Sequence, residues 1–322
     1  MTAVRPLATL LCVCALAGCS SVSERAQDSS LAAINTREPA PRKQPYPDLE
    51  PTASCEKRPL QSLPALKTLP PPGRMPPRTP MARIYAQGHL NVGADQNSLR
   101  LSYFNPLKPE EDVQGFDADV ARAVARAIFG DDRPGRIRFR AISTAQRVSV
   151  MVEHKVDIVA SAFSITCARR RRMHFSDVYH TARQRLLVPS NSSVSTLDDL
   201  KGRTVCTTAT STSGARLDGT GVRALRVRLR SDCLAALQEG EADAMTSDDA
   251  ILFGLKEQDP QTTIVGPTMN CEHWGLAMSL DEPELVRFVN AVLANMRREG
   301  RLRTLRAKWF EGLPQPTGGV SC

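Results

Sequence analysis

The sequence predicts an α/β protein with two lobes, each a mostly parallel sheet flanked by helices. From about residue 81 onward, short apolar strands alternate with amphipathic helices, an alternation typical of parallel sheets. Residues 156–161 and 242–247 also echo each other. Each follows a helix and a tight turn, and each contains an aspartate, a short apolar strand and a small polar loop. A chain of 322 residues is long enough for two such lobes.

The chain begins with the features of a signal peptide, expected over residues 1–19. Arg5 precedes an almost wholly apolar run from Leu7 to Leu16, which is too short to span a membrane. Residues 16–19, Leu-Ala-Gly-Cys, resemble the bacterial lipobox, in which the cysteine thiol carries the lipid. We therefore expect Cys19 to anchor the protein at the extracytoplasmic face of the cell membrane. Ordinary signal cleavage with an incidental cysteine is the alternative.

The next segment, residues 20–80, is rich in proline and polar residues and cannot form a core. We expect a semi-rigid, extended tether, or a leader whose detailed sequence has no role. The expected domain boundaries after it are residues 81–182 with 275–322 for lobe one, and residues 183–274 for lobe two. Two crossings between the lobes, near 179–185 and 272–276, would form a hinge beside a ligand cleft.

In lobe one we expect strands at 89–94, 137–140 and 156–160, and helices at 115–130 and 145–154. Val120, Val124 and Ile128 fall on one face of the longer helix. Asp117 can cap the start of this helix, and Gly130 can end it.

In lobe two we expect strands at 186–189, 202–207 and 242–247, before residues 274–278 return the chain to lobe one. Pro283 then suits the first position of a helix whose apolar residues recur at helical spacing as far as Met296. Gly300 ends this helix, and a last helix reaches Phe310.

Nine cysteines are present, two of them inside the signal peptide and one at the lipid site. The six that remain are an even number, which suits disulfides in an oxidising exterior. We expect Cys206 to pair with Cys233, because this bond would join a strand to a nearby helix. Cys55–Cys167 is a further candidate pair, and Cys271–Cys322 is left by elimination. Metal binding competes with this interpretation, but no C-x-x-C pair occurs and the histidines are scattered, so we expect no metal and no cofactor.

The charge pattern argues against nucleic acid as a partner. The net charge is +8, but apart from the run Arg169–Arg172 the basic residues are scattered, and no basic stripe is interleaved with aromatic residues. The sequence also shows no Ser–His–Asp or metal-spaced cluster of the kind that catalysis needs. We therefore expect a protein that is not an enzyme, with an anionic ligand or an anionic surface as its partner.

Two loops at the ends of predicted strands could hold a small zwitterion. Residues 162–169 follow the third strand of lobe one and end in Arg169, which could bind a carboxylate through two parallel N–H bonds. Residues 208–214, which include Ser211 and Thr212, open a helix in lobe two, where backbone N–H groups attract an anion. A solvated arginine face and simple helix capping are the structural alternatives.

The last predicted strand of lobe two is followed by carboxylates that could bind the ammonium group of such a ligand. Ser247, Asp248 and Asp249 stand there, and a purely capping role fits Asp249 better than Asp248.

Several short stretches then match a known pattern in order and spacing. They are GFDAD at 115–119, SITCARR at 164–170, FSD at 175–177, DDLKG at 198–202, TSDDAIL at 246–252 and KWF at 308–310. Together they resemble the amino-acid-binding family of type-two periplasmic receptors, in particular actinobacterial glutamine- and glutamate-binding lipoproteins. The resemblance runs from about Leu90 to Phe310 and implies a free amino acid held between two lobes.

The resemblance also implies roles for individual residues. Arg169 would bind the α-carboxylate, helped by Ser164 and by N–H groups near Ala162 and Ser211. Asp248 would accept from the α-ammonium, and Asp95 would line the pocket.

Arg147 stands in a stretch that resembles the corresponding loop of glutamate/aspartate binders, with Arg100 as an alternative selector of the ligand side chain. Two departures stand out. Ser98 and Thr144 occupy positions where many relatives have aromatic residues, and Thr210 stands where glycine is usual.

The expected function is a monomeric receptor that delivers glutamate, glutamine, aspartate or asparagine to an ABC permease in the membrane. A sensor for a membrane signalling partner and a dehydratase-like enzyme on the same fold are the alternatives.

Overall fold

The computed structural model describes residues 55, 60–315 and 318–322. The signal peptide, Cys19 and most of the proline-rich segment lie outside these residues. No helix within the described part is both long and apolar enough to cross a membrane.

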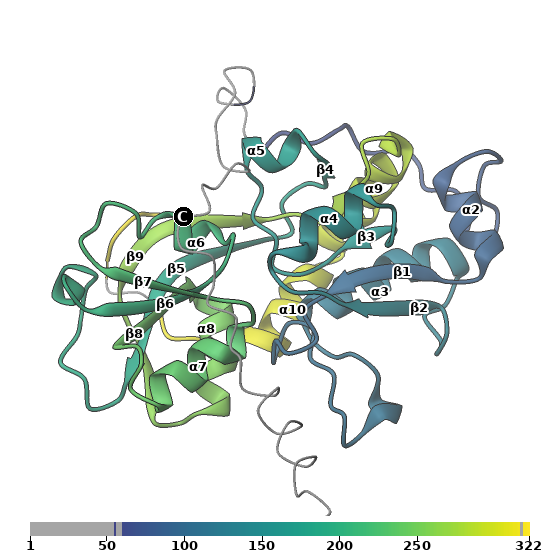
Figure 1. The fold of residues 1–322 in the computed structure, drawn as a ribbon. Helices are drawn as coiled ribbons and strands as arrows, with labels where there is room; N and C mark the ends of the chain where they lie inside the picture. Colours follow the sequence, from purple (N-terminus) through teal and green to yellow (C-terminus); the bar gives the residue numbers. More distant parts are fainter. Residues whose placement is uncertain (1–54, 56–59, 316–317) are drawn as a thin grey trace, which may run out of the picture. The chain divides into compact units, whose positions relative to one another are not determined.

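Lobe one is built on a five-stranded sheet in the order β2-β1-β3-β10-β4 (Figure 1). Its strands are β1 (Leu90–Ala94), β2 (Ile137–Ala141), β3 (Ile158–Val159), β4 (His174–Phe175) and β10 (Ala277–Met278). β1 is parallel to β2 and β3, whereas β10 runs antiparallel to both its neighbours. The sheet is thus mostly parallel, as predicted.

Lobe two repeats this plan with a sheet in the order β7-β6-β8-β5-β9. Its strands are β5 (His180–Pro189), β6 (Thr204–Thr208), β7 (Arg223–Val227), β8 (Ala244–Asp248) and β9 (Thr262–Trp274). β6 is parallel to β7 and β8, and β5 pairs antiparallel with β8 and β9. The two-lobe α/β fold predicted from the sequence is therefore present.

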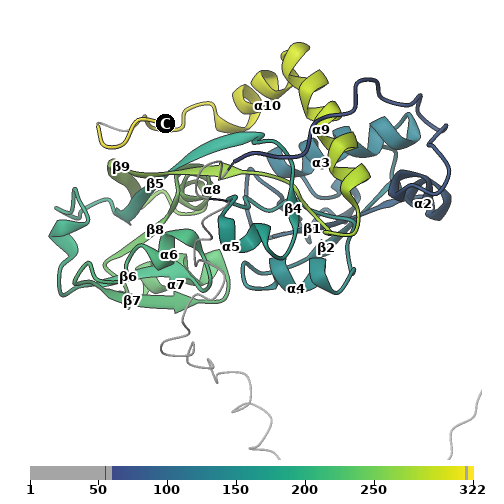
Figure 2. The same cartoon turned by 90° about the horizontal axis from the view of Figure 1, so that it is seen from above.

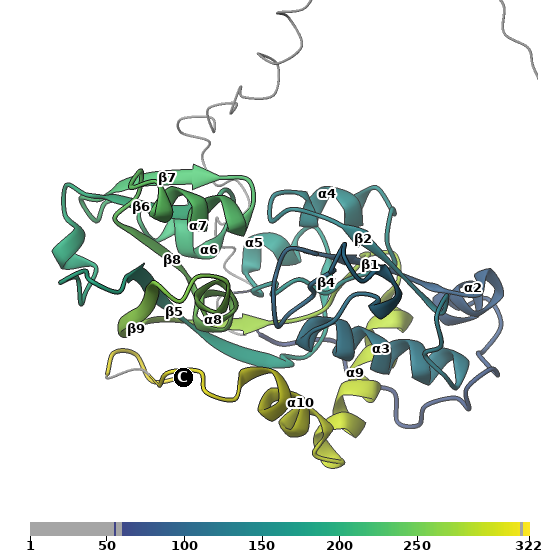
Figure 3. The same cartoon turned by 90° about the horizontal axis from the view of Figure 1, so that it is seen from below.

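Helices flank both sheets (Figures 2 and 3). Lobe one carries α2 (Pro80–Gln87), α3 (Phe116–Phe129), α4 (Gln146–Val152), α5 (Cys167–Arg170), α9 (Pro283–Arg298) and α10 (Arg301–Phe310), and lobe two carries α6 (Thr212–Ala215), α7 (Arg230–Gln238) and α8 (Asp249–Gln258).

The start of α3 differs from the sequence prediction. Gly115, not Asp117, is the N-cap residue, with a φ of 135°. A Cβ atom at Gly115 would lie 2.2 Å from the backbone of Leu101, so no other residue fits there. Asp117 is buried in the first turn of the helix and bonds elsewhere, as described below.

The echo in the sequence corresponds to one repeated structural device. In lobe one, Asp157 accepts a hydrogen bond from the backbone N–H of Asn91 in β1 at 2.8 Å. In lobe two, Asp243 accepts one from the N–H of Thr204 in β6, also at 2.8 Å. Asp157 therefore fixes β1 next to β3, and Asp243 fixes β6 next to β8.

The hinge lies where β5 and β9 enter lobe two. His180 pairs with Trp274 at the first position of the β5–β9 ladder. The His180 ring is packed among Phe116, Trp274 and Phe310, with ring centroids 4.7 to 5.3 Å away. Neither ring nitrogen has a hydrogen-bond partner among the described residues, and burial lowers the pKa of His180 to about 3. The side chain is therefore a neutral, apolar part of the hinge.

The lobe boundaries differ from the expected ones at both ends. Residues 60–79 are not a free tether, because Ser62 donates to Phe175 O and the N–H of Leu66 donates to Arg287 O. Apolar side chains such as Leu63 and Leu69 also pack on the core of lobe one. At the other end, the segment after α10 leaves lobe one and pairs with β9 of lobe two.

Three disulfides join Cys55 to Cys167, Cys206 to Cys233 and Cys271 to Cys322. Cys206–Cys233 is the predicted pair, and the other two are the candidate pairings that the sequence left open. The Cys206–Cys233 bond lies inside lobe two, between β6 and α7, where both sulfur-bearing residues are fully buried.

The hydrogen bond between Asn91 and Asp157 predicts an effect on the stability of the folded protein. Asp157→Ala should leave the half-buried N–H of Asn91 without its acceptor and remove an ion pair with Arg83, so we expect a loss of about 1–3 kcal/mol in the free energy of unfolding. Urea denaturation measures this loss. Asp281→Ala is the matched control, because that carboxylate is 80% exposed and should change the free energy by less than about 0.5 kcal/mol. Equal effects of the two substitutions would contradict the assignment.

Candidate functional site

A polar cavity lies between the two lobes. Figures 1 and 3 show α4 and α5 of lobe one on the side that faces α6 and α7 of lobe two. The cavity is lined by Thr144, Arg147, Ala162 and Ser164 from lobe one, and by Thr208, Ser211, Thr212, Ser213, Arg230, Ser247, Asp248 and Ile251 from lobe two. Most of these residues follow the ends of strands, where open α/β sheets bind ligands.

Arg169 lies in α5 and is almost fully buried. Thr166 caps this short helix by accepting from the N–H of Arg169 at 3.2 Å. The Arg169 guanidinium donates to the carbonyl of Ser164 at 2.7 Å and to the carbonyl of Thr210, in lobe two, at 3.2 Å. It therefore bridges the two lobes beside the cavity, but it is not among the residues that line the cavity, so its role as the carboxylate partner stays a prediction.

Arg147 is buried in α4 and is held by its own lobe. It donates to the carbonyls of Thr144, Ser161 and Ala162 at 3.0 to 3.3 Å. The guanidinium groups of Arg147 and Arg169 both lie over the ring of Phe163, at 4.3 and 4.7 Å from its centre. Burial, and after it the charges of Arg169 and Arg230, hold the pKa of Arg147 well below its usual range. An anion in the cavity would relieve this crowding of positive charge.

Arg230 is a cavity residue that the sequence analysis missed. It is the first residue of α7 and is 3% exposed. Its guanidinium crosses to lobe one, where it donates to the hydroxyl of Ser98 and lies 3.3 Å from the carboxylate of Asp95. Three arginines alternate at 226, 228 and 230, and nothing in the sequence says which one turns inward.

Asp95 and Ala162 differ in detail from their expected roles. Asp95 is buried at the end of β1 and pairs with Arg230, but it is not part of the cavity wall. Ala162 does line the cavity, but its N–H donates to Asp117 at 2.7 Å and so is not available to a ligand. Arg100 pairs with Glu257 and donates to the carbonyl of Trp309, away from the cavity, so it is not the selector.

The buried carboxylate of Asp117 organises the loop after β3. It accepts from the N–H of Ala162 and from the hydroxyl of Tyr179, each at 2.7 Å. Burial raises the pKa of Asp117 to about 6, although both hydrogen bonds act against the rise. The loop that carries Ser164 and Arg169 is thus fixed to α3 and to the hinge.

Asp248 stands at the end of β8 and is 4% exposed. Its carboxylate accepts from the indole N–H of Trp274 at 2.6 Å. Burial, and after it the charge of Glu272, raises the pKa of Asp248 to about 8. An ammonium group beside Asp248 would favour its ionised form. The neighbouring Asp249 instead accepts from the backbone N–H groups of Arg183 and Ala250, so its role is structural. It is not the cap that the sequence suggested, because the N-cap position of α8 is Asp248.

The loop before α6 forms the rest of the lobe-two wall. Ser211 caps α6 by accepting from the N–H of Gly214 at 3.0 Å. Thr212 donates to Glu272 at 2.8 Å, and its hydroxyl lies 3.4 Å from that of Ser164 across the cavity. Thr210, where the resemblance led us to expect glycine, has a φ of 60°. The left-handed backbone is therefore kept without glycine, and it presents the Thr210 carbonyl to Arg169.

Residues 90–312 match the family of bacterial extracellular solute-binding proteins, family 3. The chain is 29% identical over 237 residues to the ABC transporter glutamine-binding protein GlnH of Bacillus subtilis, with 73% of this chain and 85% of that relative covered. It is 30% identical to the glutamate-binding protein GluB of Corynebacterium glutamicum, over 68% of this chain and 77% of that relative.

Solved structures show the same fold. A mutant of ArgBP from T. maritima has a TM-score of 0.64 at 25% identity, and the match covers 71% of this chain and 98% of the ArgBP chain. An ancestral arginine-binding protein bound to glutamine has a TM-score of 0.63 at 27% identity, over 69% of this chain and 98% of its own.

The raised pKa of Asp248 predicts how stability depends on pH. The unfolded state releases this proton near the ordinary value of 3.8, whereas the folded state keeps it to about 8. The folded state therefore binds more protons between these values, and its stability should fall as the pH rises through this window, by at most about 1.4 kcal/mol per pH unit. Urea denaturation of the ligand-free protein at several pH values should show this fall. Asp248→Asn should make it shallower, and an unchanged slope would contradict the assignment.

Proposed function

Because the chain belongs to the bacterial extracellular solute-binding proteins of family 3, we propose that it captures a free amino acid between its lobes and delivers it to an ABC importer. In this proposal the protein is exported, lipidated at Cys19 and held at the extracytoplasmic face of the membrane, and it acts as a monomer. It carries out no chemical step, because capture needs only closure of the two lobes around the ligand.

The observation that carries the proposal is the pairing of opposite charges around one cavity. Asp248 lines the cavity, and Arg169 bonds to the carbonyl of Ser164, another lining residue. A free amino acid carries an α-carboxylate, which could pair with the guanidinium of Arg169, and an α-ammonium group, which could pair with the carboxylate of Asp248. Hydroxyls of Ser211 and Thr212 supply further polar contacts on the lobe-two wall.

The charges beyond this pair favour an acidic ligand side chain. Arg147 and Arg230 both line the cavity, but Arg230 faces Asp95, whereas the hydrogen bonds of Arg147 all go to backbone carbonyls. The side-chain carboxylate of glutamate or aspartate would give Arg147 a partner of opposite charge, whereas the amide of glutamine or asparagine would not. We therefore place the dicarboxylic amino acids first among the four proposed ligands. The similarity to the glutamate-binding protein of Corynebacterium glutamicum supports this order, and the similarity to the glutamine-binding protein of Bacillus subtilis keeps the amides in the set.

A thermal-shift screen of the full chain against the twenty amino acids tests the proposal. A ligand at about 100 times its dissociation constant should add roughly 2.7 kcal/mol, which corresponds to a rise in Tm of about 5–10 °C for a protein of this size. Arg169→Ala should abolish the shift, because the α-carboxylate loses its charge-assisted hydrogen bonds. Arg171→Ala, at an exposed neighbour, is the control and should keep it. No shift with any amino acid would overturn the proposal.

Selectivity for the acidic side chain tests the role of Arg230. Arg230→Gln should weaken glutamate and aspartate binding about 10- to 100-fold in calorimetry, and should change glutamine and asparagine binding by less than about threefold. The double variant with Asp95→Asn avoids leaving an unpaired buried carboxylate. Arg228→Gln, exposed two residues earlier, is the matched control. An equal loss for acids and amides would assign Arg230 a structural role only.

A further inference from the structure

The chain makes a third passage between the lobes after its last helix. α10 belongs to lobe one, where the indole N–H of Trp309 donates to Asp119 of α3 at 2.8 Å. The segment after α10 then runs beside β9 of lobe two, as all three ribbon views show (Figures 1 to 3). We call its described residues, 311–315 and 318–322, the C-terminal strap.

The strap pairs with the edge strand of the lobe-two sheet. The N–H of Thr268 donates to the carbonyl of Gly318 at 2.8 Å, and the N–H of Val320 donates back to the carbonyl of Thr268 at 2.9 Å. A Cβ atom on Gly319 would lie 2.1 Å from the Thr268 carbonyl oxygen, so this close approach requires glycine. Nearer α10, the buried Arg185 of β5 donates to the carbonyl of Pro314 at 2.9 Å.

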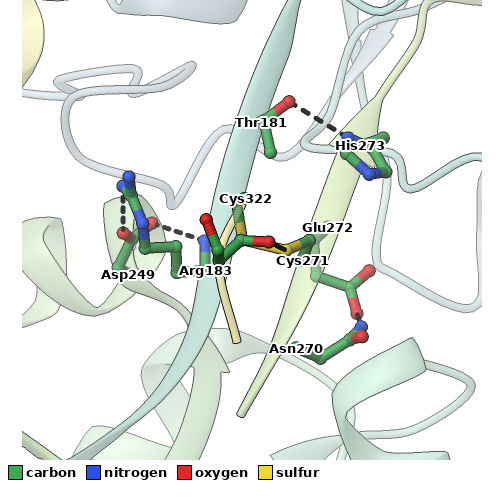
Figure 4. Close-up of a disulfide and its surroundings, with 9 residues drawn as sticks. Thr181, Arg183, Asp249, Asn270, Cys271, Glu272, His273 and Cys322 are labelled. Carbon is green, nitrogen blue, oxygen red and sulfur yellow. Dashed lines mark hydrogen bonds and ion pairs between the residues drawn. A yellow bond between two sulfur atoms is a disulfide. The ribbon is translucent and has the colours of Figure 1, made fainter. Parts of the chain in front are cut away.

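A covalent bond secures the end of the strap. Cys322 forms a disulfide with Cys271 of β9 (Figure 4). The bond closes a loop of the chain that contains β10, α9 and α10, the elements that return to lobe one. The two lobes are therefore joined at three places, and opening of the hinge has to stretch or displace the strap.

The bond also lies next to residues that shape the cavity. Glu272 follows Cys271 directly, and successive residues of a strand point to opposite faces (Figure 4). The Glu272 carboxylate accepts from Thr212, a cavity residue, at 2.8 Å. Two residues further on, Trp274 donates to Asp248. The strap thus fastens the stretch of β9 that positions two polar groups of the lobe-two wall.

We propose that the C-terminal strap is a positioning device for ligand capture, which limits how far the lobes open and keeps Thr212 and Asp248 in place. Restricting the open state lowers the conformational cost of closing on a ligand, and so raises affinity. The affinity effect rests on the proposed amino-acid binding, whereas the limit on opening does not. A strap that merely covers an edge strand would protect the sheet without changing either property.

The test compares the full wild-type chain with Cys271→Ser/Cys322→Ser, which leaves the other two disulfides intact. Calorimetry with L-glutamate and L-glutamine measures affinity, and small-angle X-ray scattering of the ligand-free protein measures the radius of gyration. We expect affinity to fall about three- to tenfold and the ligand-free radius of gyration to increase. Gly319→Ala should act in the same direction by disrupting the pairing with Thr268 while the cysteines remain. Val320→Ala, at an exposed side chain that keeps its backbone bonds, is the control.

The outcomes separate the two proposals. If the double variant keeps an affinity within about 1.5-fold of wild type and an unchanged radius of gyration, the proposal is wrong, and the strap only covers the edge strand β9. A wild-type chain that binds neither amino acid would instead count against the proposed function. The radius of gyration alone would then test whether the strap limits opening. An increase in the double variant would support this role, and an unchanged value would contradict it.

Discussion

Buried positive charge is the constraint on which the site depends. Arg147, Arg169 and Arg230 are each only 2–3% exposed, and a buried guanidinium is costly unless acceptors surround it. Backbone carbonyls supply most of these acceptors, and two come from residues with positive φ, Ala162 at 45° and Thr210 at 60°. A positive φ is unfavourable for residues other than glycine, and it persists where the surrounding structure enforces it. The loops at the cavity are thus shaped by the cations that they enclose.

Opposite charge reaches the cavity from two directions. Asp95 approaches Arg230 from lobe one, and Asp248 extends from the end of β8 in lobe two. Asp117 lies further inside and holds the Ala162 loop through its backbone N–H. The carboxylates therefore divide into one that faces the cavity and others that fix the cations or the loops around it. Asp248 is the carboxylate on the cavity wall among the described residues, and burial together with the nearby charge of Glu272 raises its pKa to about 8.

The sequence predicted those parts of the molecule that local pattern determines. Strand and helix periodicity located β1, α3 and the β8 region, and the echo around Asp157 and Asp243 proved to be a repeated hydrogen bond. What it missed depends on long-range packing. No local pattern distinguishes inward-facing Arg230 from exposed Arg228, and the proline-rich composition of residues 60–79 gave no sign that they pack on lobe one. The sequence also gave no sign that the C-terminal segment passes to lobe two, although it left Cys271 and Cys322 as a pair by elimination.

The surroundings of His180 have a consequence for how the lobes move. A hinge residue tied by directional bonds must break them when its neighbours turn. The His180 ring instead contacts the rings of Phe116, Trp274 and Phe310, and its nitrogens bond to nothing among the described residues. Dispersion contacts between rings vary smoothly with angle and need no fixed donor or acceptor. Small rotations therefore cost little at His180 itself. Resistance to opening comes instead from the directional bonds that cross between the lobes, such as those of Arg169 to Thr210 and of Arg230 to Asp95.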